Sequence, residues 1–265
     1  MNNRPIGVFD SGIGGMTVVR ALMERLPLEN IIYFGDTARV PYGIKSVETI
    51  NQYAAQITSF LVKRNVKLLI VACNTMAAVA LPTIKKLSKV PVLEVIEASA
   101  RQAVAESRSK AIGVIGTPAT INSNAYARAI HLLEKEAIIY SQACPLFVPV
   151  VEEGWFDHEA TRLIAREYLK TVIAEKVDTL VLGCTHYPLL KPLLQEIMGP
   201  QIRLIDSAEA MAGIAAALLK KEGLGNTSRQ KPDYLFCVTD VPHRFQMIGE
   251  RFLGRALSNI ELVRL

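Results

Sequence analysis

Short apolar runs alternate along the first part of the chain with longer stretches whose apolar residues recur every three or four positions. The apolar runs are 6–9, 30–34, 69–73 and 92–95. Between the second and third runs the spacing is that of one buried helical face, which falls on Val47, Ile50, Ala54, Ile57 and Leu61. Strands that alternate with helices in this way predict an α/β fold with a parallel sheet.

The same order of elements begins again in the second part of the chain. The run at Ile112 repeats the run at Ile6 after 112 − 6 = 106 residues, and the run at 138 repeats the one at 31 after 138 − 31 = 107. Cys184 repeats Cys73 after 184 − 73 = 111 residues, and the segment 205–209 repeats 95–97. These correspondences keep their order and their offsets grow slowly. They predict an internal duplication, with two similar doubly wound parallel-sheet lobes related by a pseudo-two-fold axis and facing a shared cleft.

The C-terminal part has no counterpart in this repeat. A helix is expected from about Ala208 to Lys221, followed by a polar linker over 223–231 and short strands at 234–238 and 259–263. Because the two lobes already account for the earlier strands, we expect this tail to return to the first lobe. The predicted division is therefore residues 1–97 plus 208–265 for the first lobe and 98–207 for the second.

Composition excludes several classes of protein. The chain has 265 residues, 50% hydrophobic and only 6% aromatic, which suits an aliphatic α/β core. Its net charge of +5 is spread among 25 acidic residues, so a nucleic-acid partner is not expected. The most apolar run, 68–81, is too short to span a bilayer, and no secretory signal is recognised. We expect a cytoplasmic protein, without a membrane partner.

Two of the four cysteines stand at matching positions of the repeat. Cys73 follows a buried run and precedes Asn74-Thr75, and Cys184 follows another and precedes Thr185-His186. Open parallel sheets bind ligands at the carboxyl ends of their strands. Either cysteine alone would be read as a small buried residue, but the mirrored pair favours one site with a thiol on each side. Cys144 and Cys237 are assigned to the core, and the wide spacing of all four argues against structural zinc.

Two thiols that face one carbon from opposite sides can invert that carbon. One removes a proton from one face while the other delivers a proton to the opposite face, so the two need opposite protonation states when the substrate arrives. A thiol is partly ionised near neutral pH, since its ordinary pKa is about 8.5. The sequence therefore favours a 1,1-proton transfer, although a binding protein that keeps the duplicated lobes without turnover is an alternative.

The turn at 10–15 allows two interpretations. Gly12 and Gly14 are followed by Thr17 where a dinucleotide fingerprint needs a third glycine, so that fingerprint is absent. A tight turn before a helix leaves backbone N–H groups available for a carboxylate or phosphate. The simpler interpretation is a βα turn in which Asp10 or Ser11 caps the helix that follows.

Five segments together resemble the signatures of glutamate racemases, within the aspartate/glutamate racemase superfamily. They are Asp10-Ser-Gly-Ile-Gly-Gly15, Pro41-Tyr-Gly43, Ala72-Cys-Asn-Thr75, Val148-Pro-Val-Val-Glu-Glu-Gly154 and Gly183-Cys-Thr-His186. The resemblance spans nearly the whole chain. It implies an isomerase that interconverts L- and D-glutamate for peptidoglycan synthesis, without a cofactor or metal, as a homodimer. A related racemase of aspartate or another acidic compound is the nearest alternative.

The resemblance also implies roles for individual residues. Cys73 would act on the α-proton of D-glutamate and Cys184 on that of L-glutamate, with Asp10, Glu152 and His186 as polar helpers. Glu153 is the alternative to Glu152, because both cannot face inward from an extended loop. The substrate-binding set implied is Asp10, Ser11, Tyr42, Gly43, Asn74, Thr75, Thr117, Thr120, Thr185 and His186.

Electrostatics limits how these helpers act. A carboxylate beside a thiol raises the pKa of that thiol, so Asp10 or Glu152 cannot by itself create a thiolate. An imidazolium at His186 would stabilise Cys184 as a thiolate. We hypothesise that thiolate formation is coupled to binding through the substrate ammonium group. No lysine lies at a predicted strand end, which argues against a pyridoxal phosphate Schiff base.

Overall fold

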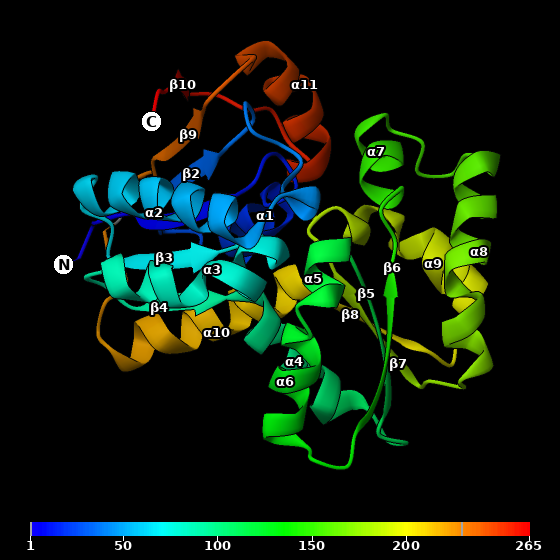
Figure 1. Cartoon of the computed structure of the whole chain (residues 1–265). Coiled ribbons are helices and arrows are strands. Elements are labelled where there is room, and N and C mark those ends of the chain that lie inside the picture. The colour runs from blue at the N-terminus through cyan, green and yellow to red at the C-terminus, as the bar shows by residue number, and fades with distance from the viewer. Residues whose placement is uncertain (1, 229) are drawn as a thin grey trace.

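The computed structural model describes residues 2–228 and 230–265 and contains two parallel sheets (Figure 1). The first sheet has the strand order β10-β9-β2-β1-β3-β4. Its strands are β1 (Ile6–Asp10), β2 (Ile31–Gly35), β3 (Leu68–Val71), β4 (Val92–Glu94), β9 (Tyr234–Val238) and β10 (Ile260–Leu262). All of its pairings are parallel, so the carboxyl ends of these strands share one edge.

The second sheet repeats the inner part of the first. It contains β5 (Ala111–Gly116), β6 (Ile138–Ala143), β7 (Thr179–Gly183) and β8 (Arg203–Asp206), in the order β6-β5-β7-β8. The order β2-β1-β3-β4 is the same arrangement of first, second, third and fourth strands, and the pairings are again parallel. The predicted fold class, two similar parallel-sheet lobes, is confirmed.

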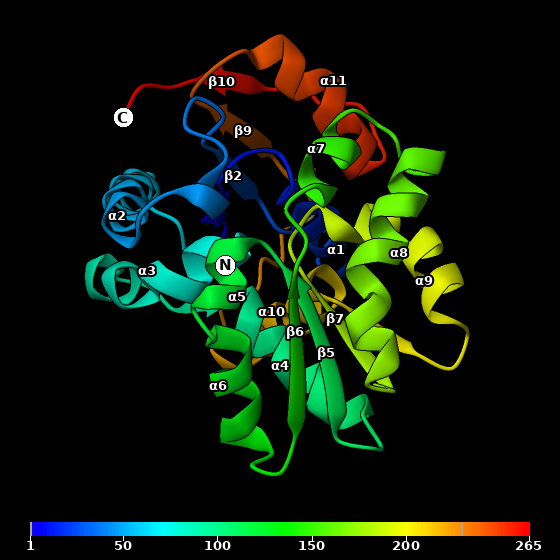
Figure 2. The ribbon, with the colours of Figure 1, turned by 45° about the vertical axis from the view of Figure 1, so that its right-hand side comes forward.

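Helices connect and cover both sheets, and two short 3-10 helices interrupt the loops. They are α1 (Met16–Arg25), η1 (Tyr42–Ile44), α2 (Val47–Lys63), α3 (Asn74–Leu87), α4 (Val95–Glu106), α5 (Pro118–Asn122), α6 (Ala125–Leu133), α7 (Phe147–Glu152), α8 (Glu159–Ala174), η2 (Tyr187–Leu190), α9 (Lys191–Met198), α10 (Ser207–Lys221) and α11 (Pro242–Leu253). Helix α10 packs against both α1 and α4, and α4 packs against α6, so these helices link the two lobes. Figure 2 shows α10 and α4 near the centre of the molecule. No described helix is long and apolar enough to cross a membrane.

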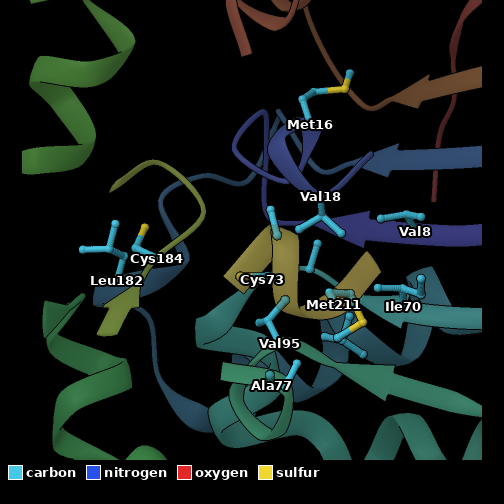
Figure 3. Close-up of a cluster of buried hydrophobic side chains, with 14 of the residues drawn as sticks. Val8, Met16, Val18, Ile70, Cys73, Ala77, Val95, Leu182, Cys184 and Met211 are labelled. Carbon is cyan, nitrogen blue, oxygen red and sulfur yellow. The ribbon is translucent and has the colours of Figure 1, made fainter. Parts of the chain in front are cut away.

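The core of the first lobe is aliphatic, as the composition suggested. Val8 of β1 is in register with Ile70 of β3, and both are fully buried. Val18 of α1 and Met211 of α10 belong to the same cluster, which Figure 3 shows together with both site cysteines. Of the predicted buried face of α2, Ile50, Ala54, Ile57 and Leu61 are buried, whereas Val47 is exposed because it begins the helix.

The C-terminal tail adds two strands to the first sheet. β9 pairs with β2, and β10 pairs with β9 at the sheet edge. The helix between them, α11, packs against α1. The division at 97/98 and 207/208 stays a proposal. Two residues of the first lobe in that division, Met1 and Arg229 of the expected linker, lie outside the described residues.

Local expectations differ from the structure in three places. The strand expected to end at Cys73 ends at Val71, and Cys73 itself is the N-cap of α3. The loop expected over 144–154 contains the helix α7. Helix α1 begins after Gly15 with no side-chain cap, so neither Asp10 nor Ser11 caps it; the Asp10 carboxylate instead accepts a hydrogen bond from the Gly12 N–H, 3.0 Å away.

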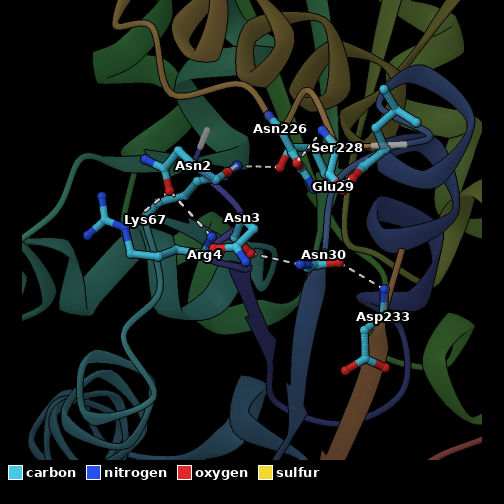
Figure 4. Close-up of polar contacts among 10 residues, drawn as sticks. Asn2, Asn3, Arg4, Glu29, Asn30, Lys67, Asn226, Ser228 and Asp233 are labelled. Atoms are coloured by element: carbon cyan, nitrogen blue, oxygen red, sulfur yellow. Dashed lines mark hydrogen bonds and ion pairs between the residues drawn. The ribbon is translucent and has the colours of Figure 1, made fainter. Parts of the chain in front are cut away.

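A buried ion pair ties the amino-terminal ends of the strands together, away from the cysteines. Lys67 precedes β3 and its Nζ lies 2.5 Å from Oε2 of Glu29, and both side chains are almost fully buried. Lys67 also donates to the Asn2 carbonyl at 3.0 Å, and Glu29 accepts from the Asn226 N–H at 2.7 Å. Figure 4 shows this polar cluster, which joins the first residues of the chain to the segment before β9.

Candidate active site

A cavity of about 380 Å³ opens at the carboxyl ends of the strands, and both lobes contribute to its wall. Cys73 and Cys184 both line it, although each is almost completely buried, with 4% and 6% of its surface exposed. Each follows the third strand of its lobe, β3 or β7. The duplicated sequence therefore brings one thiol from each half to the same cavity.

The surroundings of Cys73 favour the neutral thiol. Its Sγ accepts a hydrogen bond from the Met76 N–H at 3.5 Å and donates one to the Ser11 hydroxyl at 3.6 Å. Burial raises the pKa of this thiol to about 12, and the nearby Asp10 carboxyl adds to that rise. The hydrogen bond at the start of α3 opposes the rise without cancelling it. Cys73 is thus prepared to give a proton before it can accept one.

Asp10 lies behind this thiol, at the end of β1. Only 1% of its surface is exposed, and its Oδ1 has no hydrogen-bond partner among the described residues. Burial raises the pKa of this carboxyl, while His186 and the N–H groups of the following turn lower it. A carboxyl with a raised pKa and a free oxygen can take up a proton. Asp10 is therefore suited to accept the proton of the Cys73 thiol.

Cys184 has different partners. Its Sγ lies 3.9 Å from Nδ1 of His186, and Nε2 of the same ring lies 3.1 Å from Oε1 of Glu152. Burial disfavours an imidazolium here, but the hydrogen bonds to Cys184 and Glu152 outweigh it and raise the pKa of His186 to about 10. The bond to His186 correspondingly lowers the pKa of Glu152, although burial alone would raise it. A cationic His186 therefore lies beside the Cys184 sulfur.

The two halves approach each other closely at Gly14. A Cβ at this position would lie 2.2 Å from Oγ1 of Thr185 and 2.5 Å from Nδ1 of His186. The hydroxyl of Thr17 donates to the Thr185 carbonyl at 3.3 Å, which adds a direct bond between the lobes. A glycine at residue 14 is therefore required by this close approach, which a turn without side chains allows.

Three threonines join the lobes on the other side of the cavity. Oγ1 of Thr75 lies 3.1 Å from Oγ1 of Thr117 and 3.5 Å from that of Thr120, and the latter two are 3.0 Å apart. Next to them, the Tyr126 hydroxyl donates to Oδ1 of Asn74 at 2.6 Å. The amide nitrogen of Asn74 is buried and has no hydrogen-bond partner among the described residues.

The structure gathers most of the predicted site residues around the cavity. Those that line it are Ser11, Tyr42, Gly43, Cys73, Asn74, Thr75, Thr117, Glu152, Cys184, Thr185 and His186. Asp10 and Thr120 do not line it and lie behind the first layer, where they contact Gly12 and Thr117. The catalytic and binding roles of all these residues stay predictions.

Glu152 and Glu153 both belong to the cavity wall, but they differ in position. They come from a helical turn, so the extended-loop argument that allowed only one of them inward does not hold here. Glu152 is the one that contacts His186, while Glu153 is exposed.

Sequence reasoning missed several contributors. Arg244 of α11 lines the cavity. Phe252 of the same helix packs edge-on against the His186 ring, with 5.3 Å between the ring centroids. The Tyr42 hydroxyl donates to the fully buried Asp36 carboxylate. Arg244 and Phe252 fall outside the repeated landmarks, although the spacing of the buried positions 245, 248, 249 and 252 of α11 could have indicated a helix. Among the described residues no three His, Cys, Asp or Glu side chains are grouped so as to hold a metal ion.

Comparison with known proteins places these features in context. Residues 16–215 match the family model described as Asp/Glu/Hydantoin racemase. The glutamate racemase of Syntrophus aciditrophicus is 69% identical over 98% of this chain and 97% of its own. The crystal structure of glutamate racemase from Francisella tularensis in complex with D-glutamate has a TM-score of 0.94 at 44% identity, covering 100% of this chain and 98% of the other. Glutamate racemase isoform RacE1 of Bacillus anthracis has a TM-score of 0.96 at 37% identity, covering 100% and 99%.

Proposed function

The chain belongs to the glutamate racemases of the Asp/Glu/hydantoin racemase family and is an isomerase, and from that premise we propose that it interconverts L- and D-glutamate with two cysteines. One observation carries this proposal. Cys73 and Cys184 occupy the same place in two repeated lobes, line one cavity, and have different partners. An inversion at carbon needs two such groups, one that removes a proton and one that delivers a proton to the opposite face.

For L-glutamate the reaction begins at Cys184. Its thiolate, stabilised by the His186 imidazolium, takes the α-proton, and the electron pair of the broken C–H bond stays on the α-carbon and its carboxylate. Cys73, a neutral thiol in this structure, then delivers its proton to the opposite face. The products are D-glutamate, a Cys184 thiol and a Cys73 thiolate, so protons and charge balance.

For D-glutamate the same groups act in the opposite order, and Cys184 delivers its proton as the neutral thiol that forms when it takes the proton of the His186 imidazolium. Cys73 must first lose its proton, which burial and Asp10 both oppose. Asp10 has a raised pKa and a free oxygen, so it can receive that proton, and the substrate ammonium stabilises the resulting thiolate. We therefore expect Cys73 to ionise on binding, as the sequence suggested. Alkylation of Cys73 at pH 8 should be slow in the free protein, and rapid alkylation there would contradict this step.

Binding would use the donors around the cavity. The amide nitrogen of Asn74, the hydroxyls of Ser11, Thr75 and Thr117 and the backbone at Gly43 can donate to two carboxylates, and the ammonium can donate to hydroxyl oxygens or to the Glu152 carboxylate. The relative from Francisella tularensis was solved with D-glutamate, which supports glutamate rather than aspartate as the substrate. Parallel assays of the two amino acids separate these alternatives.

A circular dichroism assay of racemisation tests the proposal. Cys73→Ala and Cys184→Ala should each abolish interconversion of both enantiomers. Cys144→Ala and Cys237→Ala are the matched controls, because these cysteines are also buried and free but do not line the cavity. They should keep at least about a third of the wild-type rate, since small core truncations act mainly on stability. Full activity of either site variant would overturn the two-cysteine mechanism.

The same proposal extends to the role in the cell. D-glutamate made by this reaction would supply peptidoglycan synthesis in the cytoplasm, and the working form would be a homodimer. Growth of a D-glutamate auxotroph on this gene tests the first statement, and the mass of the purified protein measured by light scattering tests the last.

A further inference from the structure

One arginine stands at the mouth of the cavity. Arg244 lies in the first turn of α11 and is exposed, as are six other residues of the cavity wall, Val40, Pro41, Ile44, Pro145, Pro149 and Glu153. The cysteines are buried, so these exposed residues mark the entrance. In Figures 1 and 2 α11 and α7 lie beside each other, one from the tail of the first lobe and one from the second.

The charges of the cavity wall explain why this arginine matters. The ionisable groups that line it, besides the two thiols and Tyr42, are Glu152, Glu153, His186 and Arg244. Arg244 is the one among them whose positive charge does not depend on pH. The Cys184 thiolate of the proposed mechanism balances the His186 imidazolium, so the two carboxylates give the wall a net charge of −2 without Arg244 and −2 + 1 = −1 with it.

Arg244 is held near these carboxylates while its guanidinium remains available. Its charge helps to lower the pKa of Glu152, after the hydrogen bond and charge of His186. Within residues 2–228 and 230–265, no ion pair or hydrogen bond engages the Arg244 side chain. The helix that carries it is anchored by the buried side chains of Phe245 and Phe252, so the position of its backbone is fixed.

We propose that Arg244 is a specificity-determining residue, which admits amino acids of net negative charge by offsetting carboxylate charge at the cavity mouth. This inference rests on the proposed function and names how that same site recognises an acidic substrate. Glutamate carries two carboxylates and one ammonium, a net charge of −1, so the more negative wall without Arg244 would repel it more strongly. Both enantiomers carry the same charge, so the effect is the same for each.

Calorimetric titration with L- and D-glutamate tests the inference independently of turnover. Arg244→Met keeps the length and apolar stem but removes the charge, and the dissociation constants of both enantiomers should rise about tenfold, equivalent to about 1.4 kcal/mol. Arg244→Lys should restore binding to within about threefold of wild type, because a flexible ammonium retains the charge. The control is Arg166→Met on α8, an exposed arginine that does not line the cavity.

Ionic strength supplies a reading that a merely structural role would not change. Between 20 mM and 300 mM salt the affinity of Arg244→Met for glutamate should rise more steeply than that of the wild type, because salt screens the stronger repulsion from its more negative wall. Unchanged affinity in Arg244→Met, or equal salt dependence in both proteins, would overturn the inference. Wild-type protein that binds glutamate without racemising it would instead contradict the proposed function.

Discussion

The contact at Gly14 gives the sharpest prediction about the geometry of the site. In Gly14→Ala the new methyl carbon would lie 2.2 Å from Oγ1 of Thr185 and 2.5 Å from Nδ1 of His186. Ordinary contacts of a Cβ begin at 3.4 Å, so the turn and the 185–186 segment would have to separate by 3.4 − 2.2 = 1.2 Å at Thr185. Rotation of the Thr185 side chain relieves the clash with its hydroxyl but not the clash with His186.

His186 cannot move freely out of the way. Its ring is held between the Glu152 carboxylate at 3.1 Å and the edge-on Phe252 ring at 5.3 Å. A displacement of the imidazole therefore changes its contact with Cys184, which is already as long as 3.9 Å. Because a misplacement of about 1 Å can cost on the order of 100-fold in rate, we expect kcat to fall by about that factor in both directions.

Gly213→Ala in α10 is the matched control, because a Cβ there meets nothing within 4 Å. That variant should keep wild-type kcat and gain about 0.5–1 kcal/mol of stability, since alanine is the better helix former. Circular dichroism follows racemisation, and thermal melting shows whether each variant is folded. If Gly14→Ala melts like the wild type and racemises glutamate at the wild-type rate, the close approach of the lobes does not position His186 and the reasoning fails.

Three further predictions concern charges and hydrogen bonds that the structure places around or away from the site. Because the folded pKa of His186 is raised from 6.5 to about 10, its charged form stabilises the fold fully below pH 6.5 and this contribution is lost as the pH rises toward 10. Glu152→Gln should lower that pKa, and an NMR titration of the imidazole that still shows about 10 would contradict the role of Glu152. Tyr126→Phe leaves Oδ1 of Asn74 without its donor, so KM should rise severalfold while kcat stays within about threefold, and an unchanged KM would refute the positioning of Asn74 by this hydroxyl. Lys67→Met should reduce the free energy of unfolding in urea by about 3–5 kcal/mol, because Glu29 is left buried and unpaired, whereas Lys67→Met combined with Glu29→Leu should recover most of it. Neither change at this distant cluster should alter kcat, and a loss of activity in the folded double variant would show that the cluster is not separate from the site.

The repeated part of the fold could be predicted from the sequence because its strands are continuous apolar runs. Strands buried on both faces have this composition, and the offsets between the two copies of the pattern identified the duplication. The pairing of Cys73 with Cys184 followed from the same offsets. What the pattern could not supply was the difference between their partners, since the approach of Asp10 to Cys73 and the position of the His186 ring beside Cys184 depend on the folded backbone.

The elements around the entrance were harder to predict for physical reasons. Helix α7 has six residues and includes Pro149, which local propensities assign to a loop. It is stabilised by packing of Phe147 edge-on against Tyr168 and Tyr187, which are distant in sequence. Arg244 lies in a segment with no repeated counterpart, so neither spacing nor duplication indicated that it reaches the cavity.

The residue type and position of Asp10 indicated that it has a role, but they did not indicate which contacts it makes. The sequence suggested an ordinary helix cap or a helper of the thiol. The structure shows no cap at α1, and it shows one carboxylate oxygen bonded to the turn and the other free beside the Cys73 side of the cavity. Only the folded backbone of the turn, with Gly12 donating back to it, distinguishes these alternatives.

The origin of the proton in the product tests the two-cysteine account most directly. L-glutamate is incubated with the protein in heavy water and the reaction is stopped within the first few per cent of conversion. If Cys184 removes the proton and Cys73 delivers another from the opposite face, the D-glutamate formed carries deuterium at its α-carbon while the remaining L-glutamate keeps its hydrogen. Product that retains the original hydrogen, or equal early deuteration of both enantiomers, would mean that a single group handles the proton and would contradict the account.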